Sequence, residues 1–295
     1  MNTSPRNILA ATDYSETAER AVALAGILAV RFSADLHLLH VAVLAEDSNL
    51  DEGSRDQLDR LQAISEETRR ELLEKSSESH DVSVTPLLVR GIDPDEVIVE
   101  TASNLGCDLI VMGTHGRRGL SHLFLGSVAE RVVRTSPAPV LTLRADAVVE
   151  PGGITRILVP YDFSDASAGA IRHAAAWANA LNGEITLLHV VEPVVYPEFY
   201  SVDILPDDLM MRLTTRSEEA LDKTAAELLG GRTTTTLVEV GRAADTIVNL
   251  ADPERFDLVV MATRGLSGLE HILLGSVAES VLRRCKVPML TIPSQ

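Results

Sequence analysis

The chain has 295 residues, and its 26 basic and 43 acidic side chains give a formal net charge of −17. The length favours two domains of about 150 residues, and 45% hydrophobic with 23% charged residues is typical of a globular chain rather than a disordered one. The negative charge disfavours nucleic acid as a partner, and the longest uncharged apolar run, residues 21–30, is too short to span a bilayer.

Strand and helix patterns alternate along the first half of the chain. The patterns predict strands over residues 7–12, 35–42, 82–90, 108–113 and 139–144, and helices over 17–30, 57–77, 94–104 and 127–134. The first and fourth strands are continuously apolar, which is typical of a parallel sheet covered on both faces. The alternation therefore predicts an α/β fold with a doubly wound, Rossmann-like parallel sheet of five strands.

The second half of the chain repeats the first at a shift of 149 residues. LLHV at 38–41 falls on LLHV at 187–190, GSVAE at 126–130 falls on GSVAE at 275–279, and Asp13 falls on Asp162. The sequence thus predicts two tandem domains, over residues 1–146 and 154–295, with residues 147–153 as a linker.

Glycines and a serine follow the fourth predicted strand, at Gly113, Gly116, Gly126 and Ser127. Glycine lets the backbone approach a ligand closely, and free N–H groups at a helix start attract anions, so this spacing predicts a phosphate cradle. Asp13, after the first strand, would face it and accept a hydrogen bond from a ribose hydroxyl or an adenine amine. Glycines that serve turns alone are the alternative, which the recurrence of the pattern in the second half disfavours.

These segments, together with TDYS, YDFS and PVLTL, resemble the nucleotide-binding signature of the ATP-binding universal stress proteins, once in each half. The resemblance implies an adenine nucleotide alpha hydrolase-like fold, bound ATP, ADP or AMP with Mg²⁺, and a cytoplasmic stress-response role in which the nucleotide biases conformation or partner binding. Carried over by position, it implies a first site of Asp13, Val41, Met112, Gly113, Gly116, Gly126, Ser127 and Val128. The corresponding second site is Asp162, Val190, Gly265, Gly275, Ser276 and Val277.

The second half departs from this pattern at the first glycine. Ala262 replaces Gly113, and Leu266 with Ser267 replaces the pair Arg117 and Arg118. A methyl group at 262 would either strain a positive φ or crowd the ribose, so we expect the second site to bind more weakly.

Two other classes of function stay open. One is an enzyme, a slow ATPase or a nucleotidyl transferase, although HxGH and SGGxDS elements are absent from the sequence. The other is a scaffold whose sites stay empty. No metal site is expected from His37 and His40, because side chains three residues apart on a strand point to opposite faces.

The N-terminus lacks an apolar signal segment before its first acidic residue, so secretion is not expected, and the short apolar runs disfavour a membrane partner. The isolated cysteines Cys107 and Cys285 suit a reducing compartment, and we expect both to be buried and free. The last strand of each half, over 140–143 and 289–292, is expected at a sheet edge. Domains of the resembled family often dimerise through this strand, so the resemblance implies an intramolecular pseudo-dimer, and homodimerisation of the chain stays open.

Overall fold

The computed structural model describes residues 3–43, 52–75, 82–114, 125–147, 153–193, 207–230, 232–265 and 274–294. The first half contains β1 (Asn7–Ala11), α1 (Glu16–Phe32), β2 (Asp35–Val43), α2 (Glu52–Lys75), β3 (Val84–Gly91), α3 (Pro94–Asn104), β4 (Leu109–Gly113), α4 (Ser127–Thr135) and β5 (Val140–Leu143). The second half contains β6 (Arg156–Pro160), α5 (Asp165–Leu181), β7 (Glu184–Val191), α6 (Asp207–Leu229), β8 (Thr234–Val240), α7 (Ala243–Leu250), β9 (Leu258–Ala262), α8 (Ser276–Arg284) and β10 (Met289–Ile292).

All strands and helices predicted for the first half are present, and the largest difference is at the start of α2. This helix begins at residue 52 instead of 57, and its predicted end at 77 lies outside the described residues. The apolar positions used to predict it mark where the helix packs, with Leu61 fully buried. They say little about a turn that precedes the packed part, so the start was wrong.

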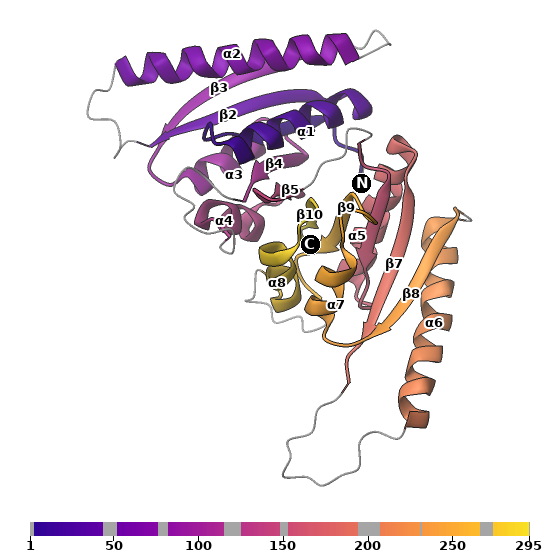
Figure 1. Cartoon of the computed structure of the whole chain (residues 1–295). Helices are drawn as coiled ribbons and strands as arrows, with labels where there is room; N and C mark the ends of the chain where they lie inside the picture. Colours follow the sequence, from indigo (N-terminus) through magenta and orange to yellow (C-terminus); the bar gives the residue numbers. More distant parts are fainter. Residues whose placement is uncertain are drawn as a thin grey trace, which may run out of the picture.

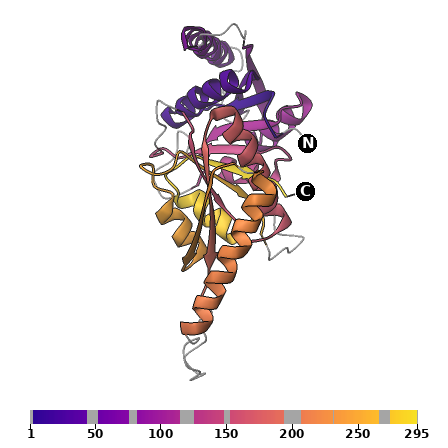
Figure 2. The same cartoon turned by 90° about the vertical axis from the view of Figure 1, so that its right-hand side faces the viewer.

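Each half forms a five-stranded parallel, doubly wound sheet, which confirms the predicted fold class. The two sheets are joined into one of ten strands in the order β3-β2-β1-β4-β5-β10-β9-β6-β7-β8. In Figure 1, β5 and β10 lie near the middle of the molecule, and the long helices α2 and α6 lie toward its two ends. Figure 2 shows the same separation of α2 and α6 from the side.

The two halves are joined along the antiparallel strand pair β5–β10. Its register is symmetric about Leu141 and Leu290, which face each other and correspond in the repeat. Side chains reinforce it reciprocally, because the Thr142 hydroxyl donates to the Met289 carbonyl at 3.2 Å and the Thr291 hydroxyl donates to the Val140 carbonyl at 3.0 Å. Each edge strand therefore satisfies its free backbone groups on the other.

Helices α4 and α8 add an ion-pair network across the same junction. Arg283 lies 2.8 Å from Glu130 and 2.9 Å from Glu279, and Arg134 lies 2.8 Å from Glu130 and 3.5 Å from Glu279. The four groups alternate in sign, so each arginine contacts one glutamate of each half.

Because β5 and β10 are antiparallel, the carboxyl ends of the two sets of parallel strands lie at opposite edges of the sheet.

Two layers of helices cover the sheet, and both halves contribute to each layer. One apolar cluster joins α1, α2, α5 and α6 to one face, and a second joins α3, α4, α7 and α8 to the other. The Phe32 and Trp177 rings meet at 5.2 Å between α1 and α5, so the first cluster is continuous across the junction. In the described part of the chain no helix is long and apolar enough to cross a membrane.

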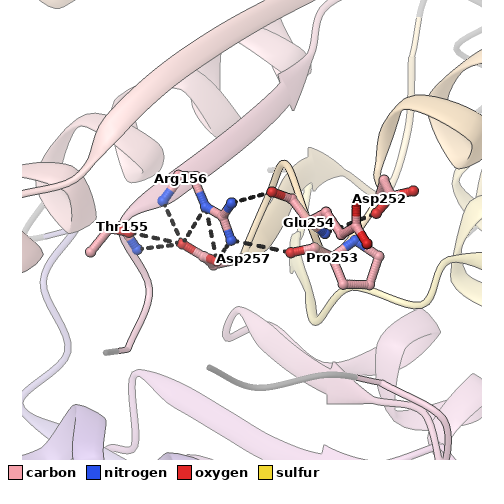
Figure 3. Close-up of polar contacts among 6 residues, drawn as sticks. All are labelled: Thr155, Arg156, Asp252, Pro253, Glu254 and Asp257. Atoms are coloured by element: carbon pink, nitrogen blue, oxygen red, sulfur yellow. Dashed lines mark hydrogen bonds and ion pairs between the residues drawn. The ribbon is translucent and has the colours of Figure 1, made fainter. Parts of the chain in front are cut away.

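An aspartate ties together the amino ends of the strands in each half. Asp108 accepts hydrogen bonds from the backbone N–H groups of Arg6 and Asn7, at 2.9–3.0 Å. Its counterpart Asp257 accepts from the backbone of Thr155 and Arg156 and from the Arg156 guanidinium, which also donates to the carbonyls of residues 253 and 254 (Figure 3). Burial opposes ionisation of Asp257, but these donors outweigh it and lower the pKa of its carboxyl below the ordinary value.

Both cysteines are buried and free, as predicted. Burial raises the pKa of each thiol to about 11, and at Cys107 the charge of Asp108 adds to this effect. A thiol with so high a pKa is almost wholly protonated near neutral pH, so these side chains act as small apolar groups of the core.

Candidate functional site

The turn between β1 and α1 places Asp13 at the carboxyl edge of the sheet. Its carboxylate oxygen Oδ1 accepts from the backbone N–H of Ser15 at 3.1 Å and from the Ser15 hydroxyl at 2.6 Å. The same hydroxyl oxygen accepts from the Ala18 N–H at 3.3 Å and so caps α1. Between them, Tyr14 has φ of 64°, in the left-handed region that non-glycine residues seldom occupy. Asp13 is thus held in a fixed, strained turn.

The end of β4 is joined directly to the start of α4. The Thr114 N–H donates to the Leu143 carbonyl at 2.7 Å, and the Gly126 N–H donates to the Thr114 carbonyl at 2.7 Å. Gly126 is the N-cap residue of α4, and no side chain of the described residues caps that helix. The second half repeats this join, because Gly275 donates to the Thr263 carbonyl at 2.7 Å and α8 likewise has no side-chain cap.

These two segments converge where the sequence predicted a site. Asp13, Val41 and Gly113 lie at the carboxyl ends of the neighbouring strands β1, β2 and β4, and the first turn of α4 begins beside them. Val41 and Met112 belong to the apolar cluster that packs under α3 and α4. Ser127 and Val128 are the first two residues of α4. Gly116, Arg117 and Arg118 lie outside the described residues.

In the second half, the aspartate and the glycine segment are in direct contact. A Cβ added to Gly265 would lie 2.3 Å from the Asp162 carboxylate oxygen Oδ2, so a side chain there would force that carboxylate to move. The other oxygen of Asp162 accepts from the Ser164 N–H at 3.1 Å and from the hydroxyls of Ser164 and Ser167, both at 2.6 Å. Ala18 stands where Ser167 does. The Ser167 hydroxyl therefore gives Asp162 a hydrogen bond that Ala18, which has no hydroxyl, cannot give to Asp13.

Neither reason that we expected for a glycine at position 113, a positive φ or close approach of the ribose to its Cα, explains it. Gly113 does not have a positive φ, and a Cβ added to it would lie 2.9 Å from the methyl group of Thr17 in α1, inside the protein. Ala262 occupies this position in the second half, and the residue that corresponds to Thr17 there is Ala166. The smaller neighbour makes room for the extra methyl, so Ala262 by itself gives no reason to expect a crowded ribose site.

Within the described ranges, no group of three or more His, Cys, Asp or Glu side chains could hold a metal ion. His40 lies on the same face of β2 as Leu38, and His37 on the same face as Leu39, so the pair does not converge. The sequence does not reveal a role for His40, although its recurrence in LLHV is a signal.

Comparison with known proteins matches both halves to one family. The model of the universal stress protein family matches residues 5–144 and 153–293. A universal stress protein of Methanocaldococcus jannaschii is 37% identical over 142 residues, covering 46% of this chain and 81% of the relative. One from Synechocystis is 25% identical over 305 residues, covering 97% of this chain and 99% of the relative.

A solved structure also matches the chain over nearly its whole length. The crystal structure of a universal stress protein from Archaeoglobus fulgidus has a TM-score of 0.70 and 23% identity, covering 97% of this chain and 98% of that one. At this identity the likeness concerns the fold, and it extends to the tandem arrangement of the two domains.

Proposed function

The chain belongs to the universal stress protein family, and from this premise we propose that each half binds an adenine nucleotide, ATP with Mg²⁺ in the first instance. The bound nucleotide biases the conformation or the partners of the chain in a cytoplasmic stress response. Residues 1–146 and 154–295 are the two binding units. The protein acts as a nucleotide-dependent binding module and not as a dedicated enzyme.

One arrangement, present twice, supports this proposal most strongly. In each half a helix without a side-chain cap starts at a glycine that is hydrogen-bonded to the end of the neighbouring central strand. A carboxylate, of Asp13 or Asp162, lies on the adjoining turn, where it accepts a hydrogen bond from a serine hydroxyl. N–H groups at a helix start bind phosphate, and the crevice where strand order reverses is where open α/β sheets bind nucleotides.

The space around Gly275 is a second, independent observation that supports the proposal. A Cβ added there would meet the Thr263 carbonyl oxygen at 3.4 Å, an ordinary contact, and its φ of −70° suits any residue. Neither packing nor backbone conformation within the described residues demands glycine, yet the same residue type stands at Gly126. A ligand that approaches the backbone closely explains a glycine at both positions.

Each part of the site has a distinct task in this proposal. The carboxylate of Asp13 accepts hydrogen bonds from the ribose or the adenine amine, while Val41 and Met112 supply apolar contact for the adenosine. Gly113 lies beneath the adenosine, and the phosphates are held by backbone N–H groups and the serine hydroxyl of the cradle. The cradle residues are Gly116, Gly126, Ser127 and Val128. The second site uses Asp162, Val190, Gly265, Gly275, Ser276 and Val277 in the same way.

Mg²⁺ fits this site only as a partner of the phosphates. Mg²⁺ in nucleotide sites is commonly held by one or two carboxylates together with phosphate oxygens and water. Groups of three or more metal-binding side chains are absent from the described ranges, and the one carboxylate at each site, Asp13 or Asp162, is assigned to the adenosine. We therefore propose that the ion enters with the nucleotide and has no site of its own.

We also propose that the β5–β10 junction serves as the dimer interface of the fold, made within one chain. Its symmetric register and reciprocal threonine bonds support this role. A homodimer of the whole chain would need a further surface.

Calorimetric titration with ATP and Mg²⁺ tests the binding proposal, using Gly126→Asp and the matched control Gly126→Ala. Gly126 has φ of −63° and ψ of 139°, which suit aspartate at an N-cap, so the variant should fold. Its carboxylate would take the N–H groups offered to phosphate and repel the triphosphate. We expect loss of one binding event in the aspartate variant and a weakened but retained event in the alanine control, whose methyl group crowds the ligand without repelling it. A wild-type chain that binds no ATP would overturn the proposal.

A further inference from the structure

A histidine fixes the residue that precedes each aspartate. The Nδ1 atom of His40 lies 2.7 Å from the Thr12 carbonyl oxygen, and the Nδ1 atom of His189 lies 2.8 Å from the Tyr161 carbonyl oxygen. A carbonyl oxygen can only accept, so Nδ1 is the donor in both halves. The N–H groups of the same two residues, Thr12 and Tyr161, donate at 2.8 Å to the strand residue just before the histidine. Both backbone groups of the residue before each aspartate are thus bonded to the neighbouring strand.

The same histidines support the residue that follows each aspartate. The Tyr14 ring centroid lies 4.2 Å from that of His40, and the Phe163 ring centroid lies 4.6 Å from that of His189. Tyr14 and Phe163 have φ of 64° and 63°, left-handed conformations that are sparsely populated for aromatic residues. Such a conformation persists only where its surroundings enforce it. Each histidine therefore holds the turn on both sides of an aspartate.

We propose that His40 and His189 are positioning residues for nucleotide binding: each imidazole, by its hydrogen bond and its ring contact, fixes the turn that presents Asp13 or Asp162 to the adenosine part of the ligand. This rests on the proposed function. The arrangement recurs although the flanking residues differ, with Thr12 and Tyr14 in one half and Tyr161 and Phe163 in the other.

Two substitutions separate the hydrogen bond from the packing. His40→Phe keeps a ring of similar size against Tyr14 but donates no hydrogen bond, so the buried Thr12 carbonyl loses that donor. His40→Asn loses the ring but places an amide N–H near the position of Nδ1–H. Both are made in a Gly275→Asp background, so that only the first site titrates, and that background protein is the reference.

ATP with Mg²⁺ and inorganic tripolyphosphate are the two probes. Because Asp13 faces the adenosine and not the phosphates, we expect His40→Phe to weaken ATP binding about five- to tenfold while tripolyphosphate affinity stays within about twofold. We expect His40→Asn to bind ATP within about threefold of the reference. A general loss of structure would weaken both probes alike.

The outcomes separate this inference from the proposed function. A reference protein that binds no ATP overturns the proposed function, and this inference falls with it. A reference that binds ATP, with His40→Phe within twofold of it, overturns the positioning role alone, as does an equal loss for both probes. If His40→Phe does not fold, His189→Phe in a Gly126→Asp background gives the same test, because Phe163 is 37% exposed and His189 is only half-buried. The same pattern of losses is expected at the second site, and ATP binding within twofold of the Gly126→Asp reference overturns the inference.

Discussion

Replacing Gly113 by alanine should destabilise the first half, and shortening Thr17 should relieve much of the damage. The added Cβ would lie 2.9 Å from the Thr17 methyl carbon and 3.3 Å from its Cβ and carbonyl carbon. Contact below 3.0 Å forces a shift in a packed core, which costs about 1–3 kcal/mol. Thr17→Ala removes the closest of these atoms and leaves the 3.3 Å contacts, the arrangement that Ala166 and Ala262 adopt in the second half.

A double-mutant cycle on the free energy of unfolding measures this coupling. We expect Gly113→Ala and Thr17→Ala each to lower stability, and the double variant to be more stable than the sum predicts, by about 1–2 kcal/mol. ATP titration of the double variant should stay within about threefold of wild type, because the methyl points at α1 and not at the ligand. The converse change, Ala166→Thr, should destabilise the second half by a similar amount. If Gly113→Ala costs nothing, or if the cycle shows no coupling, the steric explanation is wrong.

Two further expectations concern the ends of the sheet and the core. Asp257→Asn should lower the free energy of unfolding at pH 7 by about 1–3 kcal/mol, because a neutral amide accepts fewer and weaker hydrogen bonds from Thr155 and Arg156 than the buried carboxylate does. The pKa of Asp257 is lowered in the folded state, so its contribution is complete above the unfolded value of about 3.9 and is lost as pH falls through the folded value. Urea unfolding of wild type and Asp257→Asn from pH 7 to pH 2.5 should therefore show a difference in the free energy of unfolding that becomes smaller below about pH 4. A difference that does not change with pH would contradict the ionic explanation. With pKa values near 11, Cys107 and Cys285 should resist iodoacetamide at pH 8 in the native chain and react after denaturation, as read by mass spectrometry. Fast labelling of either native thiol would contradict their burial.

The strands, the repeat and the fold class could be predicted because they depend on the pattern of residue types along the chain and not on tertiary contacts. Buried parallel strands such as β1 and β4 are continuously apolar, and the shift of 149 residues aligns whole motifs. The pairing of β5 with β10 could also be expected, since each is an apolar strand at the edge of its half. The start of α2 could not be predicted, because its first turn lies outside the apolar periodicity.

The errors at the site came from contacts between distant parts of the chain. Thr17 and Gly113 are far apart in sequence, and the space between them depends on how α1 packs against β4, which the sequence does not specify. The exchange to Ala166 and Ala262 was visible in the repeat but had no meaning without that contact. His40 was likewise visible in LLHV, and its role depends on the register of β2 against β1. Both cases concern tertiary geometry that residue type does not specify.

The number of ATP molecules bound to one chain tests the central claim most directly, and native mass spectrometry in the presence of ATP and Mg²⁺ counts it. Because the two proposed sites lie at opposite edges of the sheet, they should fill without excluding each other. We predict two nucleotides for wild type, one for Gly126→Asp and one for Gly275→Asp, and none for the double variant. A wild-type chain that carries no nucleotide, or a double variant that still carries two, would contradict the account.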